Sequence, residues 1–271
     1  MMTAAARLRA MHFGAQPLIL PNVWDPVSAR AFADAGFAAL ATSSSAVAAT
    51  LGYRDGATPA EEMFAAIARI ARSVDVPVTA DAENGYALPP AELVRRLADC
   101  GLAGCNLEDS DPVTRTLTDP GQQGDYLSAV RAEAGPELVI NARVDVYVRR
   151  PAGGFDEDSA ADAAVARANA YLAAGADCTY PILAPPSALA ALVRRIGGPV
   201  NAMYVPGGPA LAELATLGVA RITFGGGLHA RVAQVIHEMA DALAAEAREI
   251  GEIGEIGQVG QVGQVGGTLG T

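Results

Sequence analysis

The chain has 271 residues, a formal net charge of −11 and a sequence pI near 4.7. This acidic balance argues against nucleic acid as a partner, because binding phosphates requires a basic surface. No run approaches the roughly 18 apolar residues of a membrane span, and no secretory signal is recognisable, so a cytoplasmic protein without a membrane partner is predicted.

Two features of residue usage narrow the chemistry. All 19 Lys or Arg residues are arginine, and the absence of lysine excludes Schiff-base chemistry and any mechanism with a lysine acid. The three cysteines, Cys100, Cys105 and Cys178, lie in apolar surroundings. They are predicted to be buried thiols rather than a disulfide framework or a nucleophile.

From residue 18 onward, short apolar runs alternate with helical patterns. The predicted strands cover residues 18–24, 39–45, 76–83, 104–109, 138–147, 177–183, 199–205 and 220–225. The predicted helices cover residues 26–36, 59–74, 90–100, 124–134, 159–174, 187–196, 209–217 and 228–250. Helix 26–36 starts near a proline and ends at a glycine, and helix 59–74 places Met63, Ile67 and Ile70 on one face.

Alternating strands and helices imply parallel strands with right-handed crossovers, which most simply close into a (β/α)8 TIM barrel. A doubly wound open sheet is the alternative. Residues 1–250 are predicted to form the barrel with its C-terminal helix. Residues 251–271 are expected to be a flexible tail, because glycine at every third position without proline suits neither a helix nor collagen.

Acidic residues follow two neighbouring predicted strands. Asp81 and Glu83 are two apart, so in an extended segment they share one face about 7 Å apart along the chain. Glu108 and Asp109 are adjacent and point to opposite faces, and Glu108 is the one predicted to face the barrel mouth. Clustered carboxylates repel one another unless a cation neutralises them, so a site for Mg²⁺, with Mn²⁺ as an alternative, is predicted.

Other polar residues at the same end leave alternatives open. Arg143 is either a structural ion-pair partner of one of these acids or a clamp for a substrate carboxylate. Asp55 is either a turn residue or an acid that holds a metal-bound water. The long loop 110–123 is typical of a lid or a site. The histidines, His12, His229 and His237, are expected to have packing or surface roles.

Five ordered pieces of the chain resemble the isocitrate lyase/phosphoenolpyruvate mutase superfamily. They are Pro21-Asn22-Val23-Trp24-Asp25, Ser43-Ser44-Ser45 with Asp55 twelve residues after Ser43, Asp81-Ala82-Glu83-Asn84-Gly85-Tyr86, Gly104-Cys105-Asn106-Leu107-Glu108-Asp109 and Asn141-Ala142-Arg143. The resemblance implies a barrel that binds Mg²⁺ and a 2-oxo acid or its enolate. It also implies a homo-oligomer, a dimer or tetramer in which the last helix is swapped between subunits.

The resemblance implies a role for each matching residue. Asp81 is the direct metal ligand, while Glu83, Glu108 and Asp55 act directly or through waters. Ser43, with the backbone N–H groups of Ser44 and Ser45, holds the substrate carboxylate or enolate oxygen, and Arg143 holds a carboxylate or developing charge. We also place Trp24 and Asp81 in the predicted substrate-binding set. The predicted catalytic set comprises Arg143, Glu108 and Tyr53, of which Tyr53 is a candidate to move the proton and is not implied by the resemblance.

The predicted function is a Mg²⁺-dependent carbon–carbon lyase or decarboxylase for a small 2-oxo or 2-hydroxy di- or tricarboxylate, releasing pyruvate or a similar oxo acid. The chain departs from the superfamily lyases because its loop, starting at Ser110, lacks their Cys-Gly-His signature, so Tyr53, Tyr180 or a loop water must handle the proton. The alternatives are a P–C mutase or hydrolase, as for phosphonopyruvate, and a non-catalytic binder of 2-oxo acids.

Overall fold

The computed structural model describes residues 2–111, 114–149 and 156–249, so the predicted tail at 251–271 lies outside the described residues. The chain divides into two compact units, Met1–His229 and Ala230–Thr271. None of the helices described is both long enough and apolar enough to cross a membrane.

The strands of the first unit form a closed ring. One parallel sheet has the order β2 (Asn22–Val23), β3 (Leu40–Thr42), β4 (Val78–Asp81), β5 (Gly104–Glu108), β6 (Val139–Val144) and β7 (Cys178–Pro181). The other has the order β1 (Leu18–Leu20), β9 (Arg221–Thr223) and β8 (Asn201–Met203). Only Pro21 separates β1 from β2, and a parallel bridge between Thr179 and Val200 joins the remaining edges. The predicted (β/α)8 barrel is therefore confirmed, and the open sheet is excluded.

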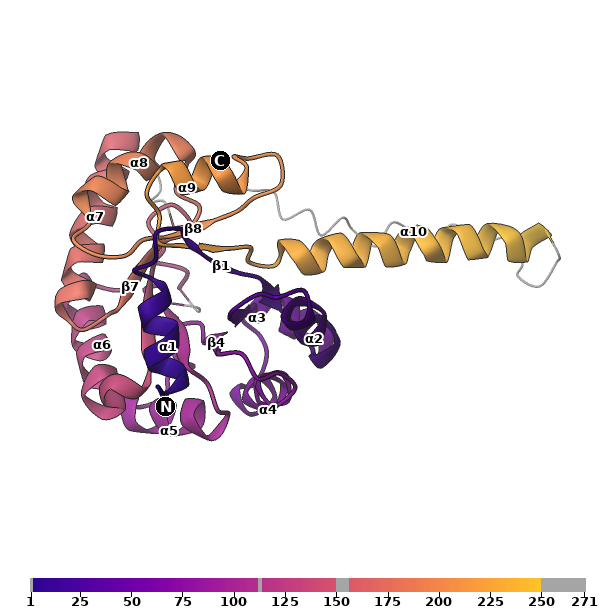
Figure 1. The fold of residues 1–271 in the computed structure, drawn as a ribbon, viewed down its shortest axis with the longest axis horizontal. Coiled ribbons are helices and arrows are strands. Elements are labelled where there is room, and N and C mark those ends of the chain that lie inside the picture. The colour runs from indigo at the N-terminus through magenta and orange to yellow at the C-terminus, as the bar shows by residue number, and fades with distance from the viewer. Residues whose placement is uncertain (1, 112–113, 150–155, 250–271) are drawn as a thin grey trace. The chain divides into compact units, whose positions relative to one another are not determined.

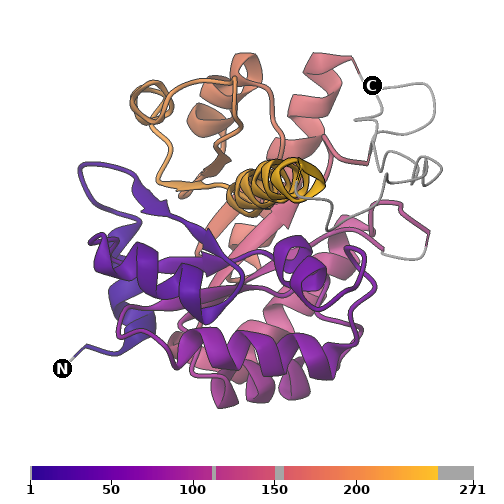
Figure 2. The ribbon, with the colours of Figure 1, turned by 90° about the vertical axis from the view of Figure 1, so that its right-hand side faces the viewer.

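Helices surround these strands (Figures 1 and 2). The first unit contains α1 (Ala4–Met11), α2 (Pro26–Asp34), α3 (Ser44–Thr50), α4 (Ala60–Ala71), α5 (Pro90–Asp99), α6 (Pro120–Ala134), the 3₁₀ turn η1 (Gly135–Glu137), α7 (Glu157–Ala173), α8 (Pro186–Arg195) and α9 (Leu211–Thr216). Proline occupies the first turn of α2, α5, α6 and α8, where its missing N–H costs nothing. The helix α6 begins earlier than predicted because Asp119 caps it by accepting from the N–H groups of Gly121 and Gln122.

Two apolar clusters hold the barrel. The larger fills the layer between strands and helices, with fully buried Ile67, Leu93 and Leu107 among its members. The smaller closes the N-terminal end of the barrel, where Leu8 of α1 packs with Leu18, Leu20 and Val139. With that end sealed, the carboxyl ends of the strands are left to form the open mouth, which is where barrel enzymes place their chemistry.

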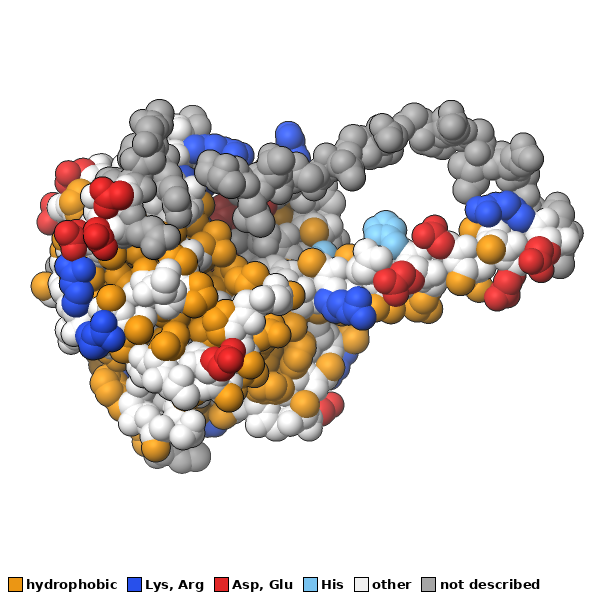
Figure 3. Space-filling model, turned by 90° about the horizontal axis from the view of Figure 1, so that it is seen from above, with side chains coloured by type: hydrophobic (Ala, Val, Ile, Leu, Met, Phe, Trp, Pro, Cys, Tyr) orange, Lys and Arg blue, Asp and Glu red, His pale blue; other side chains and the backbone are white. Residues whose placement is uncertain are grey.

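The helix α10 (Gly227–Glu249) belongs mostly to the second unit. Its exposed apolar side chains lie three, four, seven and eleven residues after Val232, which places them along one stripe: Val232, Val235, Ile236, Met239 and Leu243. Figure 3 shows hydrophobic side chains along this helix beside acidic and basic ones. No residue of α10 is buried, so its apolar stripe has no cover within the chain as described.

Candidate active site

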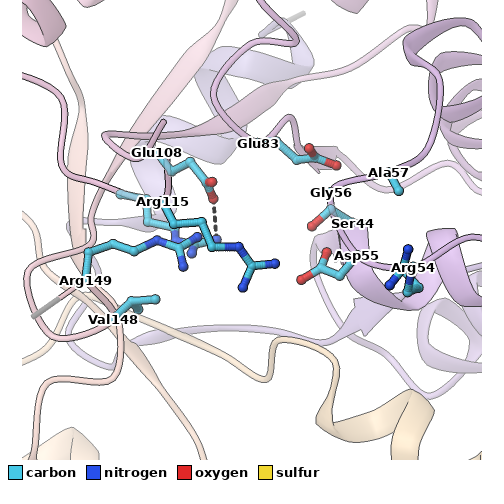
Figure 4. A pocket seen from close by; sticks show the side chains of 11 residues that line it. Ser44, Arg54, Asp55, Gly56, Ala57, Glu83, Glu108, Arg115, Val148 and Arg149 are labelled. Carbon is cyan, nitrogen blue, oxygen red and sulfur yellow. Dashed lines mark ion pairs between the residues drawn. The ribbon is translucent and has the colours of Figure 1, made fainter. Parts of the chain in front are cut away.

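The carboxyl ends of the strands surround a cavity of about 490 Å³. Its lining carries three acids, Asp55, Glu83 and Glu108, and four arginines, Arg54, Arg115, Arg143 and Arg149. Ser44 also lines it, and Figure 4 shows Ser44, Asp55 and Glu83 across the cavity from Arg115 and Arg149. The structure therefore brings together acids that the sequence places on separate strands and loops.

Asp81 is the last residue of β4 and is held by Ser44. Its Oδ2 accepts from the Ser44 hydroxyl at 2.7 Å and from the Ser44 N–H at 3.2 Å. Its own N–H donates to Thr42 Oγ1 at 3.0 Å. One carboxylate oxygen is thus fixed by the neighbouring chain segment. Asp81 is not among the residues that line the cavity, but its charge acts on three residues that do, Asp55, Glu83 and Arg143.

The serine run differs from its prediction. The strand β3 ends at Thr42, and Ser44 opens the helix α3, with Ser43 as its N-cap. The reason is local, because the Ser43 hydroxyl accepts from the Ala46 N–H and starts the helix there. The expectation of free Ser44 and Ser45 backbone donors at a strand end is therefore wrong in part, since the Ser44 N–H is bound to Asp81.

The strand β4 ends before Glu83, which the prediction had placed inside it. The strand ends at Asp81, and Glu83 has a left-handed backbone with φ of 50°. The simple alternation that would pair Asp81 and Glu83 on one face is therefore wrong, and a turn delivers Glu83 to the cavity instead. Its Oε1 is buried without a hydrogen-bond partner, and burial together with Asp81 and Asp55 raises its pKa to about 7.

Glu108, rather than Asp109, faces the barrel mouth, as predicted. Glu108 lines the cavity and pairs with Arg143 at 2.6 Å, while the fully buried Asp109 faces away. Asp109 accepts from Tyr171 Oη at 2.7 Å and from Arg167 Nη1 at 3.0 Å. Burial raises the pKa of Glu108, and Arg143 opposes that shift.

Arg143 is held on one side by Asp145, which is fully buried. Its Nε donates to Asp145 Oδ1 at 2.6 Å and its Nη2 to Oδ2 at 3.1 Å. Burial alone would lower the pKa of Arg143, but the charges of Asp145, Glu108 and Asp81 raise it overall. The guanidinium is therefore a fixed cation, and its Nη1 and Nη2 each keep one N–H beyond these contacts.

Asp55 lies on the loop after α3 and lines the same cavity. Burial and the charge of Asp81 raise its pKa, while Arg143 and Arg149 act in the opposite direction. Asp55 therefore interacts with both the acids and the arginines, which is more than a turn residue alone would do.

The acidic side chains at the cavity can be compared with the ligands that a divalent cation requires. In the part of the chain that the structure describes, no three side chains of His, Cys, Asp or Glu converge as direct ligands of one ion. Mg²⁺ commonly takes only one or two carboxylates and keeps several waters. The buried Glu83 Oε1 has no hydrogen-bond partner, and burial with the charge of Asp81 raises the pKa values of Glu83 and Asp55, so a cation beside them would stabilise their ionised forms and these residues fit a hydrated Mg²⁺.

Several predicted residues lie outside this cavity. The Tyr53 hydroxyl donates to Glu62 Oε1 at 2.6 Å on the surface. Trp24 packs edge-on against His229, with ring centroids 5.1 Å apart. Ser43 and Ser45 contact each other at 3.1 Å. Tyr180 is buried, and burial raises its pKa to about 12.

The arginines Arg54, Arg115 and Arg149 were not predicted at the site. Arg115 lies on the loop after β5, and Arg149 follows β6. Their position after the carboxyl ends of strands was a usable signal, because barrel loops at that end line the active site. The cysteines behave as predicted, since Cys100, Cys105 and Cys178 are free and buried.

Comparison with known proteins gives consistent matches. The family profile described as phosphoenolpyruvate phosphomutase matches residues 8–244. An uncharacterised protein of Mycobacterium tuberculosis is 35% identical over 216 residues, covering 79% of this chain and 80% of that protein. The oxaloacetate decarboxylase of Rhodopseudomonas palustris is 31% identical over 214 residues, covering 72% and 71%.

Solved structures agree with the sequence matches. A Burkholderia cenocepacia protein, provisionally named a phosphonomutase, has a TM-score of 0.82 and 41% identity, covering 88% of this chain and 99% of that one. The 2,3-dimethylmalate lyase structure has a TM-score of 0.78 and 26% identity, covering 90% and 88%. The chain therefore belongs to the phosphoenolpyruvate phosphomutase family, within the isocitrate lyase/phosphoenolpyruvate mutase superfamily of enzymes.

Proposed function

We propose that this enzyme is a Mg²⁺-dependent carbon–carbon lyase or decarboxylase. Its substrate is a small 2-oxo or 2-hydroxy di- or tricarboxylate, and its product is pyruvate or a similar oxo acid. The observation that carries the proposal is the convergence of Asp55, Glu83 and Glu108 with Arg143 around one cavity at the strand ends.

The acids would hold the cation, with Asp81 as a direct ligand and Glu83, Glu108 and Asp55 acting directly or through waters. A divalent cation there would stabilise negative charge that develops on a substrate oxygen. Mn²⁺ has similar ligand preferences and is expected to substitute. Ser44 fixes the orientation of Asp81, which makes Ser44 a positioning residue.

Arg143 would bind the carboxylate of the oxo acid. The contact with Asp145 fixes the plane of the guanidinium, and the remaining N–H groups on Nη1 and Nη2 can meet both oxygens of a carboxylate. Burial and the neighbouring acids raise the pKa of Glu83 to about 7 while no cation is bound, and a bound cation would lower it, so Glu83 is assigned to holding the cation rather than to moving a proton. Tyr53 is also poorly suited to moving a proton, because its hydroxyl is bound to Glu62.

The names of the relatives support C–C chemistry, since they include an oxaloacetate decarboxylase, a 2,3-dimethylmalate lyase and 2-methylisocitrate lyases. A P–C mutase or hydrolase is the second candidate. It is supported by the phosphoenolpyruvate phosphomutase profile and by the Burkholderia cenocepacia relative.

The test is an assay with Mg²⁺ on oxaloacetate, 2-methylisocitrate, 2,3-dimethylmalate and phosphonopyruvate, following pyruvate and inorganic phosphate separately. Mg²⁺-dependent release of an oxo acid without phosphate supports the lyase or decarboxylase. Phosphate release or rearrangement of phosphonopyruvate supports P–C chemistry instead. Saturable, Mg²⁺-dependent binding without any turnover identifies a non-catalytic binder and rejects the lyase.

We also propose that the protein is a homo-oligomer, a dimer or tetramer in which α10 packs against another copy. The uncovered stripe of Val232, Val235, Ile236, Met239 and Leu243 supports this, because apolar stripes of that length usually have a partner. Light scattering of the wild type and of an Ile236→Glu, Leu243→Glu variant tests it, since a monomeric wild type would reject the assembly. Location in the cytoplasm stays a prediction from the sequence.

A further inference from the structure

The cavity has a cationic side that the proposed metal site and Arg143 do not use. Arg115 extends into the cavity from the loop after β5, and Arg149 lies beside it (Figure 4). Asp55 and Ser44 lie across from them. Two guanidinium groups on one side of a small cavity suit an anionic group of a ligand, because each offers a planar set of N–H donors.

Arg115 has no side-chain partner among residues 2–111, 114–149 and 156–249, as no ion pair or side-chain hydrogen bond involves it. Its backbone is fixed nevertheless. Its N–H donates to the Asp111 carbonyl at 2.9 Å, and an antiparallel bridge joins Ser110 to Leu117. These two contacts fix the position of Arg115 on the loop, and its positively charged side chain lines the cavity.

Arg149 is anchored by one edge only. Its Nε donates to Ser110 Oγ at 3.2 Å, and Ser110 in turn donates to Asp145 Oδ2 at 2.5 Å. The same Asp145 holds Arg143, so the two arginines share one buried support. Within the described residues Arg149 Nη1 and Nη2 have no partner, which leaves the outer edge of the guanidinium for a ligand.

The two arginines favour a second negative group on the ligand. Arg143 is already paired with Glu108 and Asp145. Among the described residues, by contrast, Arg115 has no ion-pair partner and Arg149 faces only the charge of Asp55. An anionic group at Arg143 alone would therefore leave both guanidinium groups without a bound anion. A second anionic group on the same molecule would complete the balance at the far side of the cavity.

We propose that Arg115 and Arg149 form a second anion subsite, which binds the carboxylate or phosphonate on the part of the substrate that is remote from the oxo-acid end. This inference rests on the proposed function for the placement of that oxo-acid end at Arg143. Because arginine stays protonated, Arg115 and Arg149 supply positive charge and substrate selectivity rather than a proton. Substrates with a single anionic group are therefore poor ligands for this cavity.

The experiment measures binding by calorimetry with Mg²⁺ present, using pyruvate, oxaloacetate and phosphonopyruvate as probes. The variants are Arg115→Gln and Arg149→Gln, with Arg149→Lys as a charge-retaining form and Arg194→Gln as an exposed control on α8. The wild type is expected to bind a two-anion probe at least tenfold more tightly than pyruvate. Each Gln variant should lose at least fivefold for that probe and less than twofold for pyruvate, while Arg149→Lys keeps part of the affinity.

Equal losses for pyruvate and the two-anion probes, no loss at all, or a wild type that binds pyruvate as tightly as both two-anion probes would overturn the subsite. The probe that loses more affinity identifies the group, carboxylate or phosphonate. If the Gln variants show the expected selective losses but no probe is turned over, the subsite is supported and the proposed function is rejected. If the enzyme turns over a probe with Mg²⁺ but both Gln variants bind as tightly as the wild type, the proposed function is supported and the subsite is rejected.

Discussion

The burial of His12 should make the free energy of unfolding depend on pH. His12 is 5% exposed, its Nδ1 donates to the Leu8 carbonyl at 2.9 Å, and its Nε2 is buried without a partner. A proton on Nε2 would therefore be buried with no acceptor. Burial, reinforced by the charge of Arg221, lowers the pKa of His12 from 6.5 to about 4.

The magnitude follows from proton linkage. The folded state binds fewer protons than the unfolded state between pH 6.5 and pH 4, so the stabilising contribution is complete above pH 6.5 and is lost as the pH falls toward 4. The whole shift corresponds to about 3 kcal/mol, and about 2 kcal/mol of it is lost between pH 7.5 and pH 5.

The assay is urea unfolding of the wild type and of His12→Asn at both pH values. Asparagine can still donate to the Leu8 carbonyl but does not titrate. The difference in unfolding free energy between the two proteins should fall by about 2 kcal/mol from pH 7.5 to pH 5. Using a difference is necessary because the raised pKa of Glu83 has the opposite effect, making the folded state more stable as the pH falls below 7. A difference that stays constant with pH would refute the reasoning, and His237→Asn, on the exposed surface of α10, is the control.

Gly85→Ala, with Gly52→Ala as its control, tests a packing contact, and Ser44→Ala tests how Asp81 is positioned. Gly85→Ala should cost about 2–3 kcal/mol, because its φ of 87° disfavours alanine and the new Cβ would overlap the Tyr126 hydroxyl. Gly52→Ala, with φ of 85° and open space around it, should cost only about 1 kcal/mol, and equal costs in thermal or urea unfolding would contradict the overlap. Ser44→Ala should weaken Mg²⁺ binding about tenfold in calorimetry, because it removes the hydroxyl that orients Asp81, and unchanged affinity would show that this contact is not used.

Much of the fold follows from the sequence because each strand and helix is locally consistent. Apolar runs of strand length alternate with helical spacing, and prolines at the starts of α2, α5 and α8 mark helix boundaries. All eight predicted strand positions are occupied, with the first interrupted at Pro21. The helix α3 was missed because a run of serines carries no apolar periodicity, although Ser43 caps it.

The site was predicted less completely than the fold. Glu83, Glu108 and Arg143 were predicted as site residues because charged residues at the ends of buried strands have no apolar role, and all three line the cavity. Asp55, on the loop after α3, was left open as a turn residue and was assigned to the site only by the family resemblance. The path of Glu83 was not predicted, since its left-handed backbone arises from a turn rather than from strand alternation. Loop residues such as Arg115 are harder still, because a loop's path depends on contacts that strand and helix periodicity do not encode.

The central claim is that carboxylates from separate strands and loops hold one divalent cation beside Arg143. The most direct measurement is an anomalous difference map from a crystal soaked with Mn²⁺ and oxalate. One peak is expected beside Asp81 and Glu83, with oxalate reaching Arg143, and no peak is expected in the Asp81→Ala protein. An empty cavity in the wild type, or a peak that persists without the Asp81 carboxylate, would contradict this claim.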